Sequence, residues 1–225
     1  MFYYYGRKFR LAKLYPEPKH EKIIEPFAGS AAYSLHGERW KNAVELYDTY
    51  DVVVAMWKYL ISAKTSDIEA LPEPETGFDI RNYRQLCDAE RYIMGFAINT
   101  GVASPRNIVA KSNYNRWSAN KRYIIRNLYK VKHWKVSLRS YEDVPNEKAT
   151  WFIDPPYFVQ GSHYVEGKSL DYAHLSSYCK ERFGLAIVCE GEEGAWLDFQ
   201  NLKVLKGFKN RISAEKVWIG NDDES

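Results

Sequence analysis

Short runs of apolar residues alternate along this chain with longer segments in which apolar residues recur every three or four positions. The short runs predict buried strands, and the longer segments predict amphipathic helices. The expected strands are Ile23–Ile24, Ala43–Leu46, Trp134–Leu138, Trp151–Ile153, Leu185–Cys189 and a closing hairpin of Leu202–Leu205 with Lys216–Ile219. The expected helices are Ser30–His36, Val52–Ala63, Tyr83–Ile98, a helix with Ser118 as its N-cap, and Tyr172–Phe183. Strands that alternate with helices predict an α/β fold, with a mostly parallel sheet covered by helices on both faces.

Residues 66–133 interrupt this alternation. The proline-rich stretch Leu71–Glu75 is typical of a connector, and the next expected strand begins only at Trp134. We therefore predict a sheet domain made of residues 1–65 and 134–225, with residues 66–133 as a small, mainly helical insert. Phe158–Leu170 holds two glycines and little apolar pattern, which predicts a mobile loop.

The composition indicates a folded protein, since 45% of the 225 residues are hydrophobic and 16% are aromatic. Cys87, Cys179 and Cys189 form no Cys-x-x-Cys pair and have no histidine at ligand spacing, so we expect buried, reduced thiols and no metal site. The longest apolar run, Val52–Trp57, is too short to cross a membrane, and charge appears too early for a signal peptide. We expect a cytoplasmic protein without membrane contact. The sequence leaves the oligomeric state open.

The positive charge is concentrated in one segment. Between Glu90 and Glu142 there are eleven lysines and arginines and no acidic residue, whereas the rest of the chain has 21 basic and 29 acidic residues. Such a block attracts a polyanion, and nucleic acid is the natural partner. The candidate contacts to DNA are Arg106, Lys111, Asn113, Asn115, Arg116, Lys121, Arg122 and Arg126.

Aromatic and amide side chains are interleaved with these cations. Bases can stack on the aromatic rings, which belong to Tyr92, Phe96, Tyr114, Trp117, Tyr123, Tyr129 and Trp134. Asn113, Asn115 and Asn120 can read base edges. The alternative is a solvated helix face over buried aromatics, because Tyr123, Ile124, Ile125, Leu128, Tyr129 and Val131 have the spacing of an apolar helix stripe.

A run of small residues follows the first expected strand. Glu25–Ala32 (Glu-Pro-Phe-Ala-Gly-Ser-Ala-Ala) would let the backbone approach a ligand, and Asp48 lies 19 residues beyond Gly29 at the end of the next strand. An acid at that place can accept hydrogen bonds from ribose hydroxyls. The pattern Gly-x-Gly-x-x-Gly is absent, and an ordinary turn with a capping Asp remains the alternative.

A second run, Asp154-Pro155-Pro156-Tyr157, stands at the end of a strand. The two prolines stiffen the backbone and remove two N–H donors, which leaves the carbonyls between Asp154 and Pro156 free to face a ligand, so this corner offers only acceptors. Its complement is a hydrogen-bond donor, and the exocyclic amino group of a base meets that requirement. Tyr157 adds a flat ring beside it. A rigid turn without function is the alternative.

Together these motifs resemble the Dam-type, alpha-group adenine-N6 DNA methyltransferases over nearly the whole chain. Glu25–Gly29 resembles the family's Glu-Pro-Phe-x-Gly segment, and Asp154–Tyr157 resembles its catalytic motif. Three further segments resemble parts of the family. Tyr5–Lys8 resembles its N-terminal Gly-Gly-Lys segment, Val136–Tyr141 resembles the strand near the cofactor's adenine, and Lys216–Asn221 resembles the C-terminal strand.

The resemblance implies a Rossmann-like S-adenosylmethionine-dependent fold and methyl transfer to the N6 atom of adenine in double-stranded DNA, with the base flipped out. The implied catalytic residues are Asp154, Pro155, Pro156 and Tyr157. The implied contacts to S-adenosylmethionine come from Tyr4, Lys8, Glu25, Phe27, Gly29, Asp48, Ser140, Tyr141 and Asp154.

The chain departs from the family pattern at three places. Ala31 replaces the second glycine of the cofactor turn, Arg7 replaces the second glycine of the N-terminal motif, and the insert is short. The alternatives are an amino-methyltransferase acting on RNA, a cytosine-N4 enzyme, a preference for single-stranded DNA, and a non-catalytic DNA-binding protein on a decayed methyltransferase scaffold.

Overall fold

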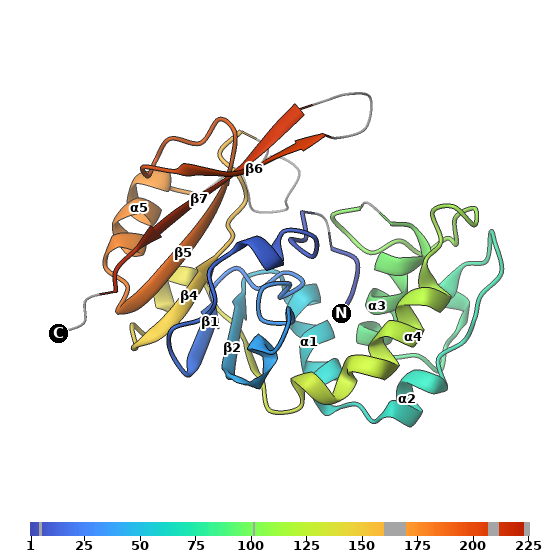
Figure 1. Cartoon of the computed structure of the whole chain (residues 1–225). Helices are drawn as coiled ribbons and strands as arrows, with labels where there is room; N and C mark the ends of the chain where they lie inside the picture. Colours follow the sequence, from blue (N-terminus) through green and yellow to red (C-terminus); the bar gives the residue numbers. More distant parts are fainter. Residues whose placement is uncertain (5, 101, 160–169, 207–211, 223–225) are drawn as a thin grey trace.

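The computed structural model describes residues 1–4, 6–100, 102–159, 170–206 and 212–222, which form a mixed α/β fold (Figure 1). The strands are β1 Lys22–Glu25, β2 Ala43–Asp48, β3 Lys135–Leu138, β4 Ala149–Ile153, β5 Gly184–Gly191, β6 Gln200–Lys206 and β7 Ile212–Gly220. The helices are α1 Asp51–Ser62, α2 Thr65–Glu69, α3 Asp88–Ile98, α4 Trp117–Asn127 and α5 Tyr172–Lys180. Short 3₁₀ turns are Ala12–Leu14, Arg39–Lys41, Ile80–Asn82, Leu128–Val131 and Tyr141–Asp143.

All the strands join one sheet in the order β3-β2-β1-β4-β5-β7-β6. The strands from β3 through β5 in this order are parallel, and β7 runs antiparallel to both β5 and β6. These pairings confirm the expectation of a mostly parallel sheet. The order β3-β2-β1-β4-β5 is that of the doubly wound dinucleotide-binding sheets.

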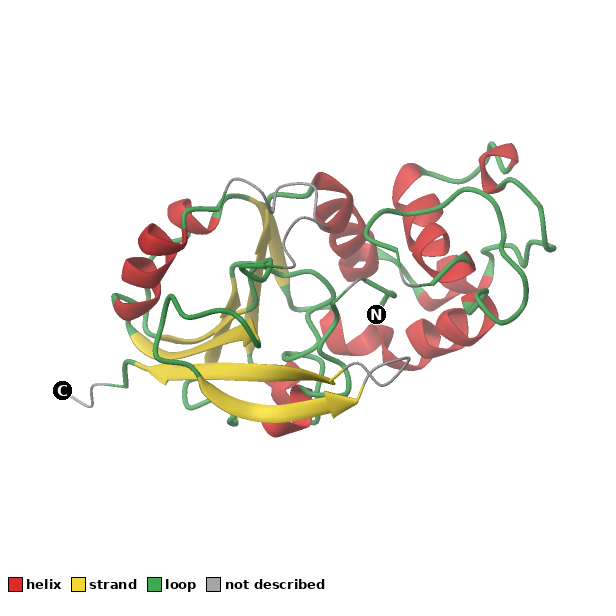
Figure 2. Ribbon diagram, turned by 90° about the horizontal axis from the view of Figure 1, so that it is seen from above, coloured by secondary structure: helices red, strands yellow, loops and turns green. Residues whose placement is uncertain are grey.

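Alternate residues of the central strands build two separate cores because successive side chains of a strand point to opposite faces. Ile23 packs into the core that includes Trp57 of α1, whereas its neighbour Ile24 packs into the core that includes Leu175 of α5. Figure 2, viewed from above, shows helices on both sides of the sheet. Burial on both faces explains why these strands are continuous apolar runs in the sequence.

The helices α1 to α4 follow β2 and precede β3, and they stand to one side of the sheet (Figure 1). The first residues of the chain lie between the sheet and these helices. Phe2 contacts the rings of Trp57 and Phe96 at centroid distances of 5.4 Å and 6.1 Å. One continuous core therefore joins the N-terminal segment, the sheet and the helical segment.

The expected helix Ser30–His36 is wrong, since this segment is a run of turns. Gly29 and Ala31 have left-handed backbone angles, with φ of 43° and 46°. These angles are incompatible with a helix beginning there. The N–H of Ser34 also leaves the helical pattern, because it donates to the carboxylate of Glu25 at 3.0 Å.

Two other helix starts differ from expectation. Helix α3 begins at Asp88 rather than Tyr83, because the guanidinium of Arg91 donates to the carbonyls of Tyr83 and Leu86 and holds them in a turn. Helix α4 begins before Ser118, whose hydroxyl donates to Glu73 at 2.7 Å instead of capping the helix. The short helix α2 was not predicted, and residues 160–169 of the expected mobile loop lie outside the described residues.

Several side chains expected at the surface are buried. Phe96, Trp117 and Trp134 belong to the core, so they offer no face on which a base could stack. Asn120 is only 3% exposed and cannot read a base from the surface. Conversely Cys87, expected to be buried, is exposed, whereas Cys179 and Cys189 are buried as expected.

Among the described residues, no helix combines the length and apolar character needed to cross a membrane. The same part of the chain holds no cluster of three or more His, Cys, Asp or Glu side chains placed to bind a metal ion.

Candidate active site

The carboxyl ends of β1, β2 and β4 meet at one edge of the sheet, and β1 and β4 are the strands at which the chain order reverses. In open α/β sheets, ligands bind in the crevice outside this point. A cavity of about 260 Å³ lies there. All nine residues expected at the cofactor line it: Tyr4, Lys8, Glu25, Phe27, Gly29, Asp48, Ser140, Tyr141 and Asp154.

The turn after β1 is fixed to the end of β2. The N–H of Gly29 donates to Oδ2 of Asp48 at 3.0 Å, and the N–H of Tyr50 donates to Oδ1 of the same carboxylate at 2.9 Å. A side chain at Gly29 would combine its left-handed φ with a contact of 3.3 Å to the ring of Tyr4. The carboxylate of Asp48 is thus held at the cavity wall.

Glu25 contributes to the wall in a different way. Its Oε1 accepts hydrogen bonds from the N–H of Ser34 at 3.0 Å and from Oγ of Ser34 at 2.5 Å, and only 2% of the residue is exposed. Burial raises the pKa of Glu25 to about 8, although the bonds from Ser34 oppose the shift. Glu25 is therefore mainly protonated at neutral pH, and it holds the run of turns that begins at Ser30.

The corner after β4 carries an ion pair. Oδ1 of Asp154 lies 2.8 Å from Nζ of Lys8, and 22% of the Asp154 side chain is exposed. Burial raises the pKa of Asp154 to about 6, against the attraction of Lys8. Burial alone would lower the pKa of Lys8, but the carboxylates of Asp154 and Glu215 raise it overall. The pair therefore holds Lys8 charged and leaves Asp154 largely ionised at neutral pH.

The two prolines of this corner differ in their surroundings. Pro156 lines the cavity, whereas Pro155 is buried and does not. The carbonyl of Pro156 accepts a hydrogen bond from the hydroxyl of Tyr172 at 2.6 Å. The expectation that every carbonyl of the corner is free for a ligand is therefore wrong at Pro156.

Tyr157 stands next to the ion pair but outside the lining of the cavity. Its hydroxyl donates to Oε1 of Glu215 at 2.6 Å, and Nζ of Lys8 lies 4.5 Å from the centre of its ring. Tyr15 donates to the same oxygen of Glu215 at 2.7 Å. Glu215, only 5% exposed, thus fixes two tyrosines and lies 3.7 Å from Lys8.

Sequence reasoning missed Tyr15 and Glu215. Tyr15 belongs to the N-terminal segment and Glu215 to β7, 200 residues apart, so no motif joins them. The available signal was an acidic residue directly before the expected strand Lys216–Ile219.

The far end of the cavity is aromatic. The rings of Phe27 and Tyr141 stack with centroids 5.3 Å apart, and the Tyr141 hydroxyl lies 2.8 Å from Nδ1 of His174. The separation of the rings leaves no room for another ring between them, so a flat ligand would pack against the pair. Ser140 lines the same end of the cavity.

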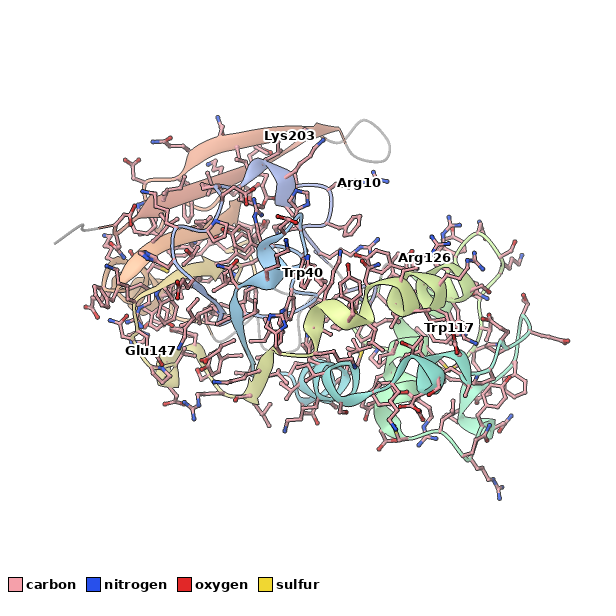
Figure 3. The ribbon with its side chains drawn as sticks, turned by 60° about the horizontal axis from the view of Figure 1, so that its bottom comes forward. Arg10, Trp40, Trp117, Arg126, Glu147 and Lys203 are labelled. Atoms are coloured by element: carbon pink, nitrogen blue, oxygen red, sulfur yellow. The ribbon has the colours of Figure 1, made fainter. Side chains whose placement is uncertain are left out.

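The eight residues expected to bind DNA lie away from this cavity, since none of them lines it. Six are exposed: Arg106, Lys111, Asn113, Arg116, Arg122 and Arg126. The remaining two have structural contacts. Oδ1 of Asn115 accepts from the N–H of Trp117 at 2.9 Å, and Nζ of Lys121 binds the carbonyl of Leu71 and lies 3.6 Å from Glu73. Figure 3 labels Arg126 at the surface on α4 and Trp117 near the start of the same helix.

In comparisons with known proteins, no family model matches the chain, and no curated protein matches it significantly.

Proposed function

We propose that this chain transfers a methyl group from S-adenosylmethionine to the N6 amino group of adenine in DNA. One observation carries the proposal: the turn at Phe27–Gly29, the carboxylate of Asp48 and the proline-stiffened corner at Asp154 line the same cavity. Together they place a carboxylate that can accept hydrogen bonds from hydroxyl groups beside a corner that offers only hydrogen-bond acceptors. The resemblance of these segments to the adenine methyltransferases supports the same conclusion.

The lining suits the parts of S-adenosylmethionine. Phe27 and Tyr141 offer a flat apolar face to an adenine ring, and Asp48 offers acceptors to ribose hydroxyls. The carboxylate of Asp154 would attract the positive charge on sulfur. The volume of about 260 Å³ is near the lower end of small-molecule pockets, which span about 300–1,000 Å³. When bound, S-adenosylmethionine supplies a methyl group carried on a positively charged sulfur.

The protein's part in the reaction is to align the amino group and accept its hydrogens. The lone pair of an adenine amino group is delocalised into the ring. Hydrogen bonds to the Asp154 carboxylate, which lines the cavity, would draw that nitrogen toward tetrahedral geometry and localise the pair. As the nitrogen forms its bond to the methyl carbon, the bond from that carbon to sulfur would break with its electron pair left on sulfur, so that S-adenosylhomocysteine leaves. The surplus amino proton would pass to the carboxylate of Asp154. Alignment of this kind contributes roughly 7–11 kcal/mol in well-oriented reactions.

Because Lys8 already binds Asp154 at 2.8 Å, the incoming amino group must share the carboxylate with it. Glu215, 3.7 Å from Lys8, keeps a second negative charge beside the ammonium while this happens.

The adenine of a duplex must leave the helix stack to reach this corner, at a cost of a few kcal/mol. Stacking on Tyr157, whose ring is fixed by Glu215, would return about 1–3 kcal/mol. The exposed cations of the acid-free segment would hold the phosphates.

The proposal is tested by incubating the protein with methyl-labelled S-adenosylmethionine and, separately, duplex DNA, single-stranded DNA and RNA. Nucleoside analysis by mass spectrometry should find N6-methyladenine in duplex DNA. Label only in RNA, or only as N4-methylcytosine, would replace the proposal by one of the alternatives. Calorimetry with S-adenosylmethionine would separate an inactive enzyme from a decayed scaffold, which should show no heat of binding.

A further inference from the structure

A second cavity, of about 230 Å³, lies between the N-terminal segment and α4. Its inner wall is formed by apolar side chains that include Phe2, Ala32 and Leu35. It shares lining residues with the first cavity, among them Arg7 and Ser30. The two cavities are therefore neighbours across the N-terminal segment.

One buried polar group in this cavity has no partner. Asn120 lines it, is 3% exposed, and its Nδ2 makes no hydrogen bond within the described part of the chain. An unpaired buried amide costs about 1–3 kcal/mol. A buried water molecule would not satisfy this amide well, because a stable buried water needs several polar partners and most of the cavity wall is apolar. Asn120 lines the cavity, so its side chain is one of the polar groups that a ligand there would meet.

The mouth of the cavity is aromatic and positively charged. Phe9 is 52% exposed and meets the ring of Tyr123 edge-on at 6.1 Å. The guanidinium of Arg7 lies 4.0 Å from the ring centre of Tyr3 and 5.5 Å from that of Phe9. Flat faces beside a guanidinium suit a heteroaromatic ring that is joined to a negative charge.

More positive charge lies on the same side of α4. Arg126 follows Tyr123 by three positions, so both side chains occupy one stripe of the helix. Arg126 is exposed, as is Arg10 of the N-terminal segment, and Figure 3 labels both at the surface.

We propose that this cavity binds a second nucleobase of the DNA, beside the adenine that is methylated, with its edge paired to the amide of Asn120. The inference rests on the proposed function only in taking DNA as the partner. The volume of about 230 Å³ leaves room for a base. The phosphates on either side of this base would face Arg7 and Arg126. Asn120 would favour a base whose edge can pair with an amide.

The binding test uses Ala119→Phe, which fills the mouth of the cavity from an exposed position on α4. The matched control is Ala70→Phe, at an exposed alanine that lines neither cavity. Affinity for a dye-labelled duplex is measured by fluorescence anisotropy without cofactor, after melting curves have shown that both variants fold. Ala119→Phe should bind about tenfold more weakly, the loss expected for one stacked base, and Ala70→Phe should stay within about twofold of wild type. Equal affinities for all three proteins would overturn the proposal.

A second measurement needs neither a variant's stability nor enzymatic turnover. The side-chain amide resonance of Asn120 is followed by NMR in ¹⁵N-labelled wild-type protein, with Asn120→Ala used to assign it. Addition of the duplex should shift this resonance. Duplex binding that leaves it unmoved would refute the base pocket even if methyl transfer occurs, whereas a shift without methyl transfer would refute the proposed reaction and leave the pocket standing. Failure of the duplex to bind at all would refute both.

Discussion

At the scale of single residues, Asp154 is the group on which the chemistry depends. Its carboxylate is paired with Lys8 at 2.8 Å, and the negative charges of Glu215 and Glu190 lie near enough to oppose its ionisation. Burial is the largest influence and raises its pKa to about 6. A carboxylate in this state is ready to accept hydrogen bonds at neutral pH and loses that ability in mild acid.

The rate of methyl transfer should therefore fall as the pH drops through about 6, by about tenfold per pH unit below it. The contribution of Asp154 to the free energy of unfolding should change in the opposite direction. A carboxyl whose pKa is raised in the folded state binds its proton more tightly when folded, so protonation stabilises the folded state as the pH falls from about 6 to about 4. Initial rates and thermal melts across pH 4.5–8 would separate the two effects. Rates that stay level between pH 5 and 7.5 would contradict the role given to Asp154.

Glu25 allows a separate test of a buried carboxyl. Because its pKa is raised to about 8, folding favours the protonated form, and this contribution to stability is lost as the pH rises through about 8. Glu25→Gln keeps an acceptor for Ser34 and cannot ionise, so its melting temperature should match wild type near pH 4 and exceed it by a margin that grows up to about pH 8 and is complete at pH 9.

The control for this comparison is Glu38→Gln, at an exposed glutamate. It should change the melting temperature little at pH 4 or at pH 9. Parallel loss of stability at pH 9 in wild type and Glu25→Gln would show that Glu25 is not the group that titrates.

At the scale of elements, the central strands β1, β4 and β5 were predictable because each is an apolar run buried on both faces. The helix expected at Ser30–His36 was wrong because the spacing of apolar residues carries no information on backbone angles, and Gly29 and Ala31 have left-handed angles. The stacking role expected for Trp117 failed for a related reason. Its aromatic ring is needed in the core, where Nε1 donates to the carbonyl of Pro72 at 2.7 Å.

Helix α4 is the element on which DNA binding is predicted. Replacing Arg122 and Arg126 together by glutamine should weaken duplex binding and reduce the slope of log affinity against log salt by about 2, since each lost phosphate contact removes about one unit. The same change at Lys148 and Lys180, exposed cations outside this helix, should leave the slope unchanged. Salt titrations by fluorescence anisotropy measure both. An unchanged slope in the α4 variant would remove this helix from the DNA interface.

At the scale of the whole molecule, the sheet topology explains why the sequence identified so much of the candidate site. Phe27, Asp48 and Asp154 each lie at or just after the carboxyl end of a parallel strand, and these ends meet at one edge of the sheet. The place of Glu215 could not be predicted in this way. Strand β7 lies antiparallel beside β5, and sequence periodicity does not give the order of strands in a sheet. The second cavity was equally unpredictable, since it forms where the N-terminal segment meets α4.

The most direct test of the central claim compares Asp154→Ala with wild type and with Asp198→Ala, a substitution at an exposed acid that lines neither cavity. Transfer of labelled methyl groups from S-adenosylmethionine into adenine of duplex DNA is measured for each, with melting curves to establish folding. Wild type and Asp198→Ala should methylate adenine, whereas folded Asp154→Ala should lose about a hundredfold or more of the rate. Methylation by Asp154→Ala at the wild-type rate would contradict the catalytic role of Asp154.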